Sequence, residues 1–213
     1  MSSDVLVTTP AQRQTEPHAE AVSRNRRQQA TFRKVLAAAM ATLREKSYAD
    51  LTVRLVAARA KVAPATAYTY FSSKNHLIAE VYLDLVRQVP CVTDVNVPMP
   101  IRVTSSLRHL ALVVADEPEI GAACTAALLD GGADPAMRAV RDRIGAEIHR
   151  RITSAIGPGA DPGTVFALEM AFFGALVQAG SGTFTYHEIA DRLGYVVGLI
   201  LAGANEPSTG GSE

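Results

Sequence analysis

The sequence predicts an all-α protein of about nine helices. Apolar residues recur at spacings of three and four along most of the chain, and the strict alternation typical of strands is nearly absent. Proline and capping residues divide the chain into segments of helical length. With 213 residues, of which 48% are hydrophobic, the chain is long enough to bury a sizeable core.

The first half is predicted to contain one long helix and three shorter ones. The first extends from about Arg26 to Glu45, with an apolar stripe made by Phe32, Val35, Leu36, Ala39 and Leu43. A short helix follows Thr52, and a third begins at Pro64, since proline is tolerated at the first helical position. Ser73 caps a fourth helix, which ends at Pro90.

The second half is predicted to contain longer helices, each with a recognisable start. One covers about Ile101 to Ala115, and the next starts near Pro118 and stops at Gly131-Gly132. Asp134-Pro135 opens a strongly amphipathic helix, and Asp161-Pro162 opens another. Thr185 and Glu188 form a capping box for the last helix.

The composition of the two terminal segments and the number of cysteines limit which classes of protein are possible. Residues 1–22 and 206–213 are polar or rich in Pro, Ser, Thr and Gly, which predicts disordered tails. Cys91 and Cys124 are the only cysteines, so we expect no disulfide framework and no zinc module, and a cytoplasmic location. No signal peptide is apparent, and the most apolar stretch, 165–177, is too short to span a membrane and contains Glu169.

The zero net charge hides a basic first third. Residues 1–90 carry 13 Lys and Arg against 7 Asp and Glu, and between Arg24 and His76 there are 11 basic residues against two acids, Glu45 and Asp50. A local excess of nine positive charges attracts polyanions, although a solvated basic surface is the alternative.

A segment inside this basic region has the pattern of a helix-turn-helix. Small residues, Ala57 and Ala60, permit two short helices to cross closely, and Ala67 and Phe71 share one face of the second helix. The other faces carry hydroxyls and rings, which reach phosphate oxygens and base edges. The segment therefore predicts a surface that lies on DNA, with a small helical hairpin whose tyrosines pack in a core as the alternative.

The segment from Val35 to Leu77 resembles the DNA-binding domain of TetR-family transcriptional regulators. The matching positions are Tyr48, Thr52, Val53, Arg54, Ala57, Ala60, Val62, Tyr68, Tyr70, Phe71, Ser73, Lys74 and Leu77. The resemblance implies a helix-turn-helix domain at 23–74 and a ligand-binding and dimerisation domain at 75–205.

The resemblance also assigns roles by position. Thr52, Thr66, Tyr70 and Lys74 match phosphate-contacting positions, and Arg54, Pro64, Ala65, Tyr68 and Thr69 match positions that face bases. Ser47 and Lys61 stand where the family usually has glycine, so either the turn differs or strain is accepted there. Lys61 is expected to gain a phosphate contact in return, and Ala63 leaves Pro64 to set the start of the recognition helix.

The resemblance further implies a homodimer that uses the last two helices and an effector pocket between the middle helices. We expect Phe172, Leu176, Leu193, Gly194, Val197, Gly198 and Leu201 at the dimer contact, with burial inside one monomer as the alternative. Expected pocket residues are Arg102, Met137, Val140, Arg141, Ile144, Phe166, Met170 and Phe173, although each is also typical of plain core or surface.

Among TetR-like proteins the sequence is most similar to the actinobacterial repressors of sterol and cholesterol catabolism. This implies a transcriptional repressor of lipid or sterol catabolism genes, released from its operator by a bulky apolar effector that is sterol-derived or an acyl-CoA. An arginine such as Arg102 or Arg141 would then meet an anionic group.

Two other classes of protein, an enzyme and a helical adaptor, are alternatives to a DNA-binding regulator. A small helical enzyme acting on apolar esters would need a positioned nucleophile, an acid–base pair or a metal. The five histidines are scattered without ligand spacing, and no glycine-rich phosphate loop is present, so neither an enzyme nor a bound cofactor is expected. A helical adaptor that does not bind DNA leaves the basic segment and the Tyr-x-Tyr-Phe match unexplained.

Overall fold

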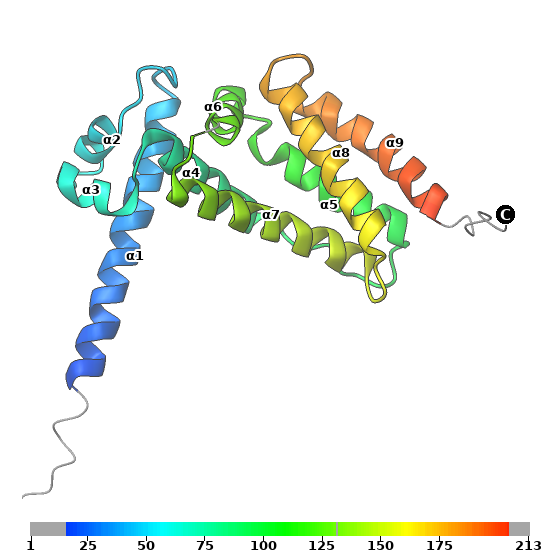
Figure 1. Ribbon diagram of the computed structural model, residues 1–213, viewed down its shortest axis with the longest axis horizontal. Coiled ribbons are helices and arrows are strands. Elements are labelled where there is room, and N and C mark those ends of the chain that lie inside the picture. The colour runs from blue at the N-terminus through cyan, green and yellow to red at the C-terminus, as the bar shows by residue number, and fades with distance from the viewer. Residues whose placement is uncertain (1–15, 131, 205–213) are drawn as a thin grey trace, which may run out of the picture.

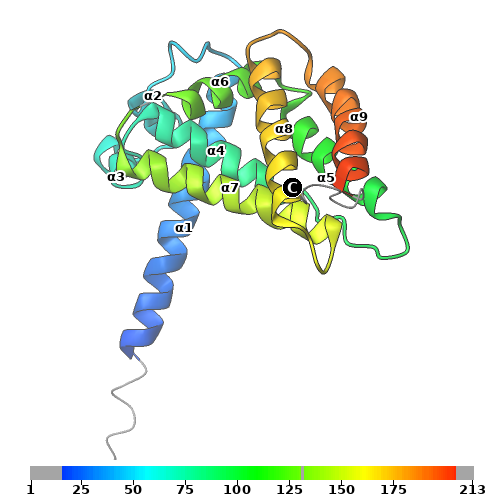
Figure 2. The same ribbon diagram turned by 45° about the vertical axis from the view of Figure 1, so that its right-hand side comes forward.

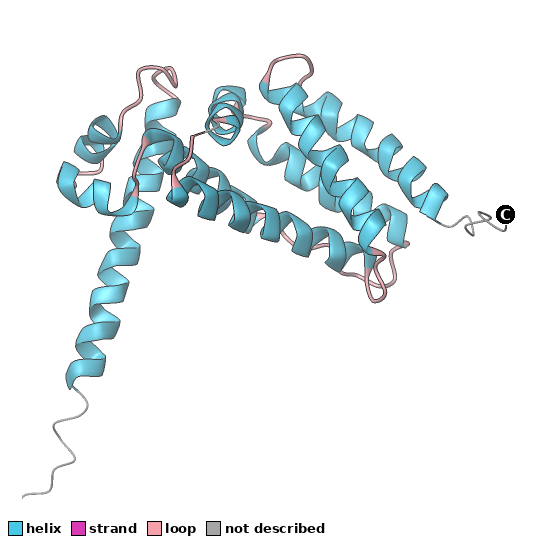
Figure 3. Cartoon of the chain, viewed as in Figure 1, coloured by secondary structure: helices cyan, strands magenta, loops and turns pink. Residues whose placement is uncertain are grey.

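The computed structural model describes residues 16–130 and 132–204, and these form nine α-helices with no strand (Figures 1 and 3). The predicted all-α class and helix count are confirmed for this part of the chain. In order, the elements are α1 Glu16–Leu43, α2 Val53–Arg59, α3 Pro64–Tyr70, α4 Lys74–Gln88, α5 Met99–Ala111, a short 3₁₀ turn η2 Leu112–Val114, α6 Pro118–Leu129, α7 Pro135–Ile156, α8 Pro162–Gly180 and α9 Tyr186–Ala204.

The capping residues explain most of the helix starts. The Ser73 hydroxyl accepts the His76 backbone N–H at 3.1 Å, and the Asp161 carboxylate accepts the N–H of Thr164 at 2.7 Å. Thr185 and Glu188 form the predicted capping box, with the Thr185 backbone N–H donating to Glu188 at 2.8 Å and the Glu188 N–H donating to Thr185 at 3.2 Å.

Helix α1 differs from its prediction. It begins at Glu16, so residues 16–22, predicted as part of a disordered tail, are helical. Periodicity missed this start because the apolar stripe begins only at Phe32. The predicted tails at 1–15 and 206–213 lie outside the described residues.

Two helical groups share α4. Helices α2 and α3 pack on the second half of α1 and against one another, while α5 to α9 form a separate bundle (Figures 1 and 2). Helix α4 contacts α1 on one side and α6 and α7 on the other, and its residues 76–83 are all buried. Helix α4 therefore connects α1 to the bundle through α6 and α7.

A buried arginine fixes the far end of α4. Arg151 of α7 is 1% exposed, and its guanidinium donates to the Val89 carbonyl at 3.0 Å and to the Glu147 carboxylate at 2.6 Å. Pairing of this kind is required, because an unpaired buried charge costs several kcal/mol. The contact locks the C-terminal end of α4 against α7.

Helix α8 is long and apolar enough, by length and composition, to cross a membrane, but core helices of soluble proteins pass the same test. Only 28% of its apolar window is buried within the chain, so a large part of its apolar surface faces outward.

Candidate DNA-binding surface and effector cavity

The α2–α3 pair has the geometry of a helix-turn-helix. The Thr52 hydroxyl accepts the Leu55 backbone N–H at 3.1 Å and caps α2. Ala57 and Ala60 are buried where the two helices meet, so that their backbones approach closely. The chain then turns through Lys61, whose φ of 53° is the left-handed conformation that glycine usually supplies.

The two positions that lack the usual glycine behave differently. Lys61 accepts the strained conformation, whereas Ser47 is not among the described residues with positive φ. The Ser47 hydroxyl instead donates to the Asp50 carboxylate at 2.7 Å and accepts the Asp50 N–H at 3.3 Å. The turn is therefore altered at Ser47 and strained at Lys61.

The recognition helix α3 buries one narrow face and exposes the rest. Ala67 and Phe71 are fully buried, as their spacing predicted. Ala63 makes no side-chain cap, and Pro64 occupies the first turn. Tyr68 remains 48% exposed on the outer side.

Eight of the ten predicted DNA-contacting residues are exposed on this surface: Thr52, Arg54, Lys61, Pro64, Ala65, Thr66, Tyr68 and Thr69. The Thr69 hydroxyl donates a hydrogen bond to the Thr66 carbonyl at 2.7 Å, so toward solvent its oxygen can act only as an acceptor. All eight side chains are therefore accessible from solvent.

The remaining two, Tyr70 and Lys74, are engaged inside the domain. The Tyr70 ring packs edge-on against Phe32 of α1 with centroids 6.1 Å apart. The Lys74 ammonium donates to the Tyr48 carbonyl at 3.1 Å and lies 4.4 Å from the centre of the Tyr48 ring. Lys74 therefore stabilises the α1–α2 turn, a role that sequence reasoning missed.

Polar contacts join this domain to the helical bundle behind it. Arg44, at the end of α1, pairs with Glu117 just before α6, through one N–O contact of 2.6 Å and a second that is shorter. Asn75 of α4 bridges Tyr48 and Asp130, the residue that follows α6.

A second contact links the end of α3 to the start of α7. The Ser72 hydroxyl donates to Asp134, the cap of α7, at 2.5 Å. The two ends of α6 and the start of α7 are thus linked by hydrogen bonds to the helices that carry the helix-turn-helix.

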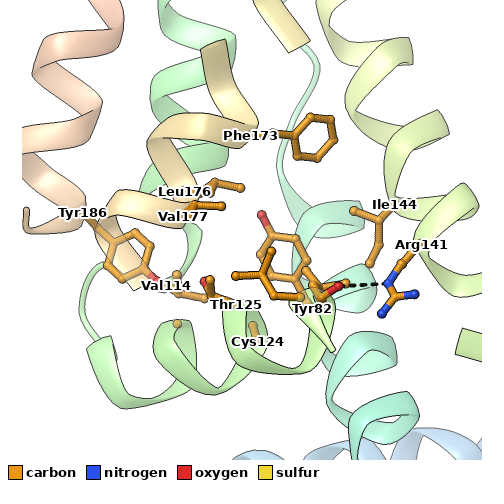
Figure 4. Close-up of a pocket in the computed structure, with 13 residues that line it drawn as sticks. Tyr82, Val114, Cys124, Thr125, Arg141, Ile144, Phe173, Leu176, Val177 and Tyr186 are labelled. Atoms are coloured by element: carbon orange, nitrogen blue, oxygen red, sulfur yellow. Dashed lines mark hydrogen bonds between the residues drawn. The ribbon is translucent and has the colours of Figure 1, made fainter. Parts of the chain in front are cut away.

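The helical bundle contains a cavity of about 270 Å³, shown in Figure 4. Its wall is apolar and comes from α4, η2, α6, α7, α8 and α9: Tyr82, Val114, Gly121, Cys124, Thr125, Leu128, Leu129, Arg141, Ile144, Phe173, Leu176, Val177 and Tyr186. Leu129, Phe173 and Val177 are exposed at the surface, so the mouth lies between α6 and α8.

Few polar groups reach the cavity wall. Burial raises the pKa of Tyr82 far above its usual value, and the Tyr82 hydroxyl has no hydrogen-bond partner among the described residues. Burial also raises the pKa of the Cys124 thiol to about 12, so this cysteine is neutral and unreactive.

The one charged group of the wall is already bonded. The Arg141 side chain donates to the Leu128 carbonyl at 2.9 Å, drawn as a dashed line in Figure 4, and also to the Asp130 carbonyl. Arg141 thereby closes the C-terminal end of α6 and forms part of the cavity at the same time.

The predicted pocket residues divide into three groups. Arg141, Ile144 and Phe173 line the cavity, whereas Met137 and Val140 are buried in the core and do not line it. Arg102 donates to the Ala155 and Ile156 carbonyls at 2.8 and 3.0 Å and so caps the end of α7. Phe166 and Met170 are 63% and 55% exposed on the outside of α8.

Sequence reasoning missed most of the wall, notably Tyr82, Cys124 and Tyr186. Tyr186 packs so closely on Gly121 that a Cβ there would collide with its ring, so this glycine is required for α9 to meet α6. No spacing rule joins positions so far apart in the chain.

The predicted dimer residues are also redistributed. Phe172, Leu193, Val197 and Leu201 are buried within the chain, and Leu176 lines the cavity. Gly194 faces Thr104 of α5, where an added Cβ would lie 3.3 Å from the threonine methyl, and Gly198 has open space. The exposed apolar surface instead includes Phe166, Met170, Tyr195 and Leu199.

Comparison with known proteins agrees with the helix-turn-helix. Residues 35–81 match the family model of bacterial regulatory proteins of the tetR family. This segment runs from the second half of α1 through α3 and into α4, and it contains the whole exposed recognition surface. Over these residues the chain is therefore similar to bacterial regulatory proteins of the tetR family.

Solved structures of similar fold extend over the rest of the chain. A TetR transcriptional regulator from Rhodococcus sp. RHA1 has a TM-score of 0.70 at 21% identity, over 85% of this chain and 99% of that one. The Thermus thermophilus repressor FadR, solved with lauroyl-CoA, has a TM-score of 0.60 at 19% identity, over 85% of this chain and 100% of its own. Bacillus subtilis FadR, solved with stearoyl-CoA, has a TM-score of 0.54 at 14% identity, over 81% of this chain and 98% of its own.

Proposed function

We propose that this protein is a cytoplasmic, ligand-responsive repressor that binds a two-fold symmetric operator as a homodimer. The observation that carries the proposal is the exposed face of α3, with Ala65, Thr66, Tyr68 and Thr69 free of the core. Tyrosine, threonine and alanine contact base edges and methyl groups in a major groove. Residues 23–74 would form the DNA-binding domain and 75–205 the effector and dimer domain, with α4 as the shared element.

The effector proposed here is an apolar molecule bound between α4, α6, α7 and α8. A cavity of about 150 Å³ holds benzene, so 270 Å³ scales to about eleven non-hydrogen atoms. A four-ring sterol is larger and would require the cavity to expand. An acyl chain enters more easily, with its head group outside the mouth at Leu129, Phe173 and Val177.

The two FadR structures, which hold acyl-CoA molecules, support this choice. We propose in addition that the regulated genes serve lipid catabolism. Arg141 would be reached by an anionic group only after leaving the carbonyls of α6. Apolar chains are therefore preferred over small carboxylates inside the cavity.

The response to effector would pass through α6. Its start is bonded to the DNA-binding domain by the Arg44–Glu117 pair. At its other end Asp130 accepts from Asn75 of α4, and Asn75 in turn accepts from the Tyr48 hydroxyl of that domain. Helix α6 also forms part of the cavity wall. A ligand shifts the equilibrium only when it prefers one conformation, so it must bind the form that does not bind DNA more tightly. Operator DNA must then weaken ligand binding by the same factor.

The test begins with selection of a binding site from a random duplex library, because the operator is defined by the protein itself. Footprinting on the selected site should give two related half-sites about one helical turn apart, and titration should saturate at one dimer or a multiple of it. A footprint without two-fold symmetry, or saturation by a single chain, contradicts the proposal. Fatty acyl-CoA and sterol panels, read by release of the selected site, then test the effector.

A further inference from the structure

Helix α1 extends beyond the body of the DNA-binding domain. Its first buried described residue is Val35, and residues 25–30 are all exposed. At 1.5 Å per residue, the segment 16–31 projects by about 24 Å. Figures 1 and 2 both show this part of α1 standing clear of every other helix.

A helix that packs on nothing gains no stability from tertiary contacts, and polar helices of this length are marginal alone. The segment therefore calls for a partner that orders it.

The projecting part and the turn that follows carry one basic stripe. Arg26 and Arg33 are seven residues apart, as are Arg27 and Lys34, so each pair stacks on the same side of the helix. All four are exposed, and their side chains form no ion pair or hydrogen bond within the part of the chain described. The buried residues of α1, beginning with Val35 and Leu36, lie on the opposite side.

The stripe reaches the recognition helix. A groove at this place is lined by one acid, two cations and four uncharged residues: Asp84, Arg33, Arg87, Gln28, Gln29, Phe32 and Tyr70, the last at the end of α3. By contrast, the cations Arg44 and Arg59 near the other end of the domain are neutralised by Glu117 and Glu45. The free positive charge of the domain therefore concentrates along α1 and the exposed face of the helix-turn-helix.

We infer that the α1 stripe of Arg26, Arg27, Arg33 and Lys34 is a second DNA-binding element, which holds the phosphate backbone of the duplex outside the bases read by α3. Unpaired guanidinium groups on a projecting helix match the charge and geometry of phosphates. Phosphate contacts fix the position of a protein on the duplex without reading its sequence. The inference rests on the proposed DNA binding and adds a site outside the helix-turn-helix.

The experiment compares three double variants of the full chain on a selected operator and on a random-sequence duplex. Arg26→Gln with Arg27→Gln removes two charges, and Arg26→Lys with Arg27→Lys keeps them. Gln28→Ala with Gln29→Ala is the matched control, since both glutamines are exposed and uncharged in the same turns. Circular dichroism confirms that each variant keeps its helix content and melting temperature.

The glutamine variant should bind both duplexes at least about fivefold more weakly near 0.1 M salt, and its salt slope should be less steep by about two. The lysine variant should bind like wild type, and footprints should lose protection at the outer edges only in the glutamine variant. Equal behaviour of the glutamine variant and the Gln28–Gln29 control overturns the inference, as does an equally weak lysine variant. Wild-type protein that binds no duplex would instead overturn the proposed function itself.

Discussion

Lys61 is the only non-glycine residue in the described part of the chain with a left-handed backbone, at a φ of 53°. This conformation costs about 1–2 kcal/mol for a residue with a Cβ, while glycine adopts it freely. We expect Lys61→Gly to raise the free energy of unfolding by about 0.5–1 kcal/mol, measured by urea denaturation. Lys46→Gly is the control, because Lys46 is an exposed turn residue without positive φ and should give no gain.

The same substitution tests why lysine is present at a strained position. Loss of a phosphate-contacting cation should make the salt slope of DNA binding less steep by about one. If Lys61→Gly stabilises the fold and leaves the salt slope unchanged, Lys61 is not a phosphate contact.

Glu147 gives a pH-dependent contribution to stability. The hydrogen bond from Arg150 lowers the pKa of Glu147 to about 2 against partial desolvation, and Arg151 adds to the effect. Because this pKa is below the unfolded value of 4.5, the stabilisation is complete above pH 4.5 and is lost as the pH falls toward 2. At neutral pH we expect Glu147→Gln to cost about 1–2 kcal/mol, since Arg151 is left buried with a neutral partner.

Urea denaturation of wild type and Glu147→Gln across this pH range measures the effect. The difference between them should shrink as the carboxylate is protonated. Asp142→Asn is the control, since Asp142 is exposed on the same helix and its side chain forms no hydrogen bond or ion pair within the described part of the chain. A difference that stays constant from neutral pH to pH 2 would remove Glu147 as the titrating group.

At the scale of the elements, local sequence signals predicted where helices start, but they did not predict which other helices or cavity each side chain contacts. Ser73, Asp134, Asp161 and Thr185 cap the helices that they were expected to cap, because a cap is a contact between residues two or three apart. Periodicity likewise identified Ala67 and Phe71 as the buried side of α3.

What failed was the assignment of one apolar side chain to a cavity and another to the core. Met137 and Ile144 lie on the same stripe of α7 and both are buried, yet only Ile144 lines the cavity. The cavity lies beside the part of α7 that contains Ile144, whereas Met137 is about two turns closer to the start of the helix. Two phenylalanines of α8 also have different surroundings: Phe166 is exposed, whereas Phe172 is fully buried. Hydrophobic spacing gives the face of a helix, and only the packed helices decide what that face meets.

The cavity provides a prediction at this scale. Leu176→Trp should fill part of the 270 Å³ space, so we expect effector affinity to fall at least about tenfold while operator affinity changes by less than about twofold. Ile101→Trp is the matched control, since Ile101 is 55% exposed on α5 and does not line the cavity. Calorimetry with a responsive acyl-CoA measures the first quantity, and gel shift measures the second. A folded Leu176→Trp protein that binds effector like Ile101→Trp would place the effector elsewhere.

At the scale of the whole molecule, we expect the exposed apolar side of α8 and α9 to be buried against another protein surface. Phe166, Met170, Tyr195 and Leu199 are exposed, and only 28% of the apolar window of α8 is buried within one chain. Met170, Gly174 and Tyr195 line a groove between the two helices, and we expect side chains of a second copy to occupy it. In a two-fold dimer the same patch is used by both chains, so the two helices from each copy would form a four-helix contact.

Met170→Asp tests this arrangement directly. Each dimer would bury two unpaired carboxylates, so we expect the dimer dissociation constant to rise at least about a hundredfold, which corresponds to about 3 kcal/mol. Because two recognition helices must bind together, operator affinity should fall with it, while the melting temperature of the monomer changes little since Met170 is 55% exposed. Ile101→Asp, at an equally exposed position on α5, should leave the dimer intact. Sedimentation equilibrium decides the matter, because a Met170→Asp protein that stays as dimeric as Ile101→Asp would show that this apolar side of α8 does not hold the two chains together.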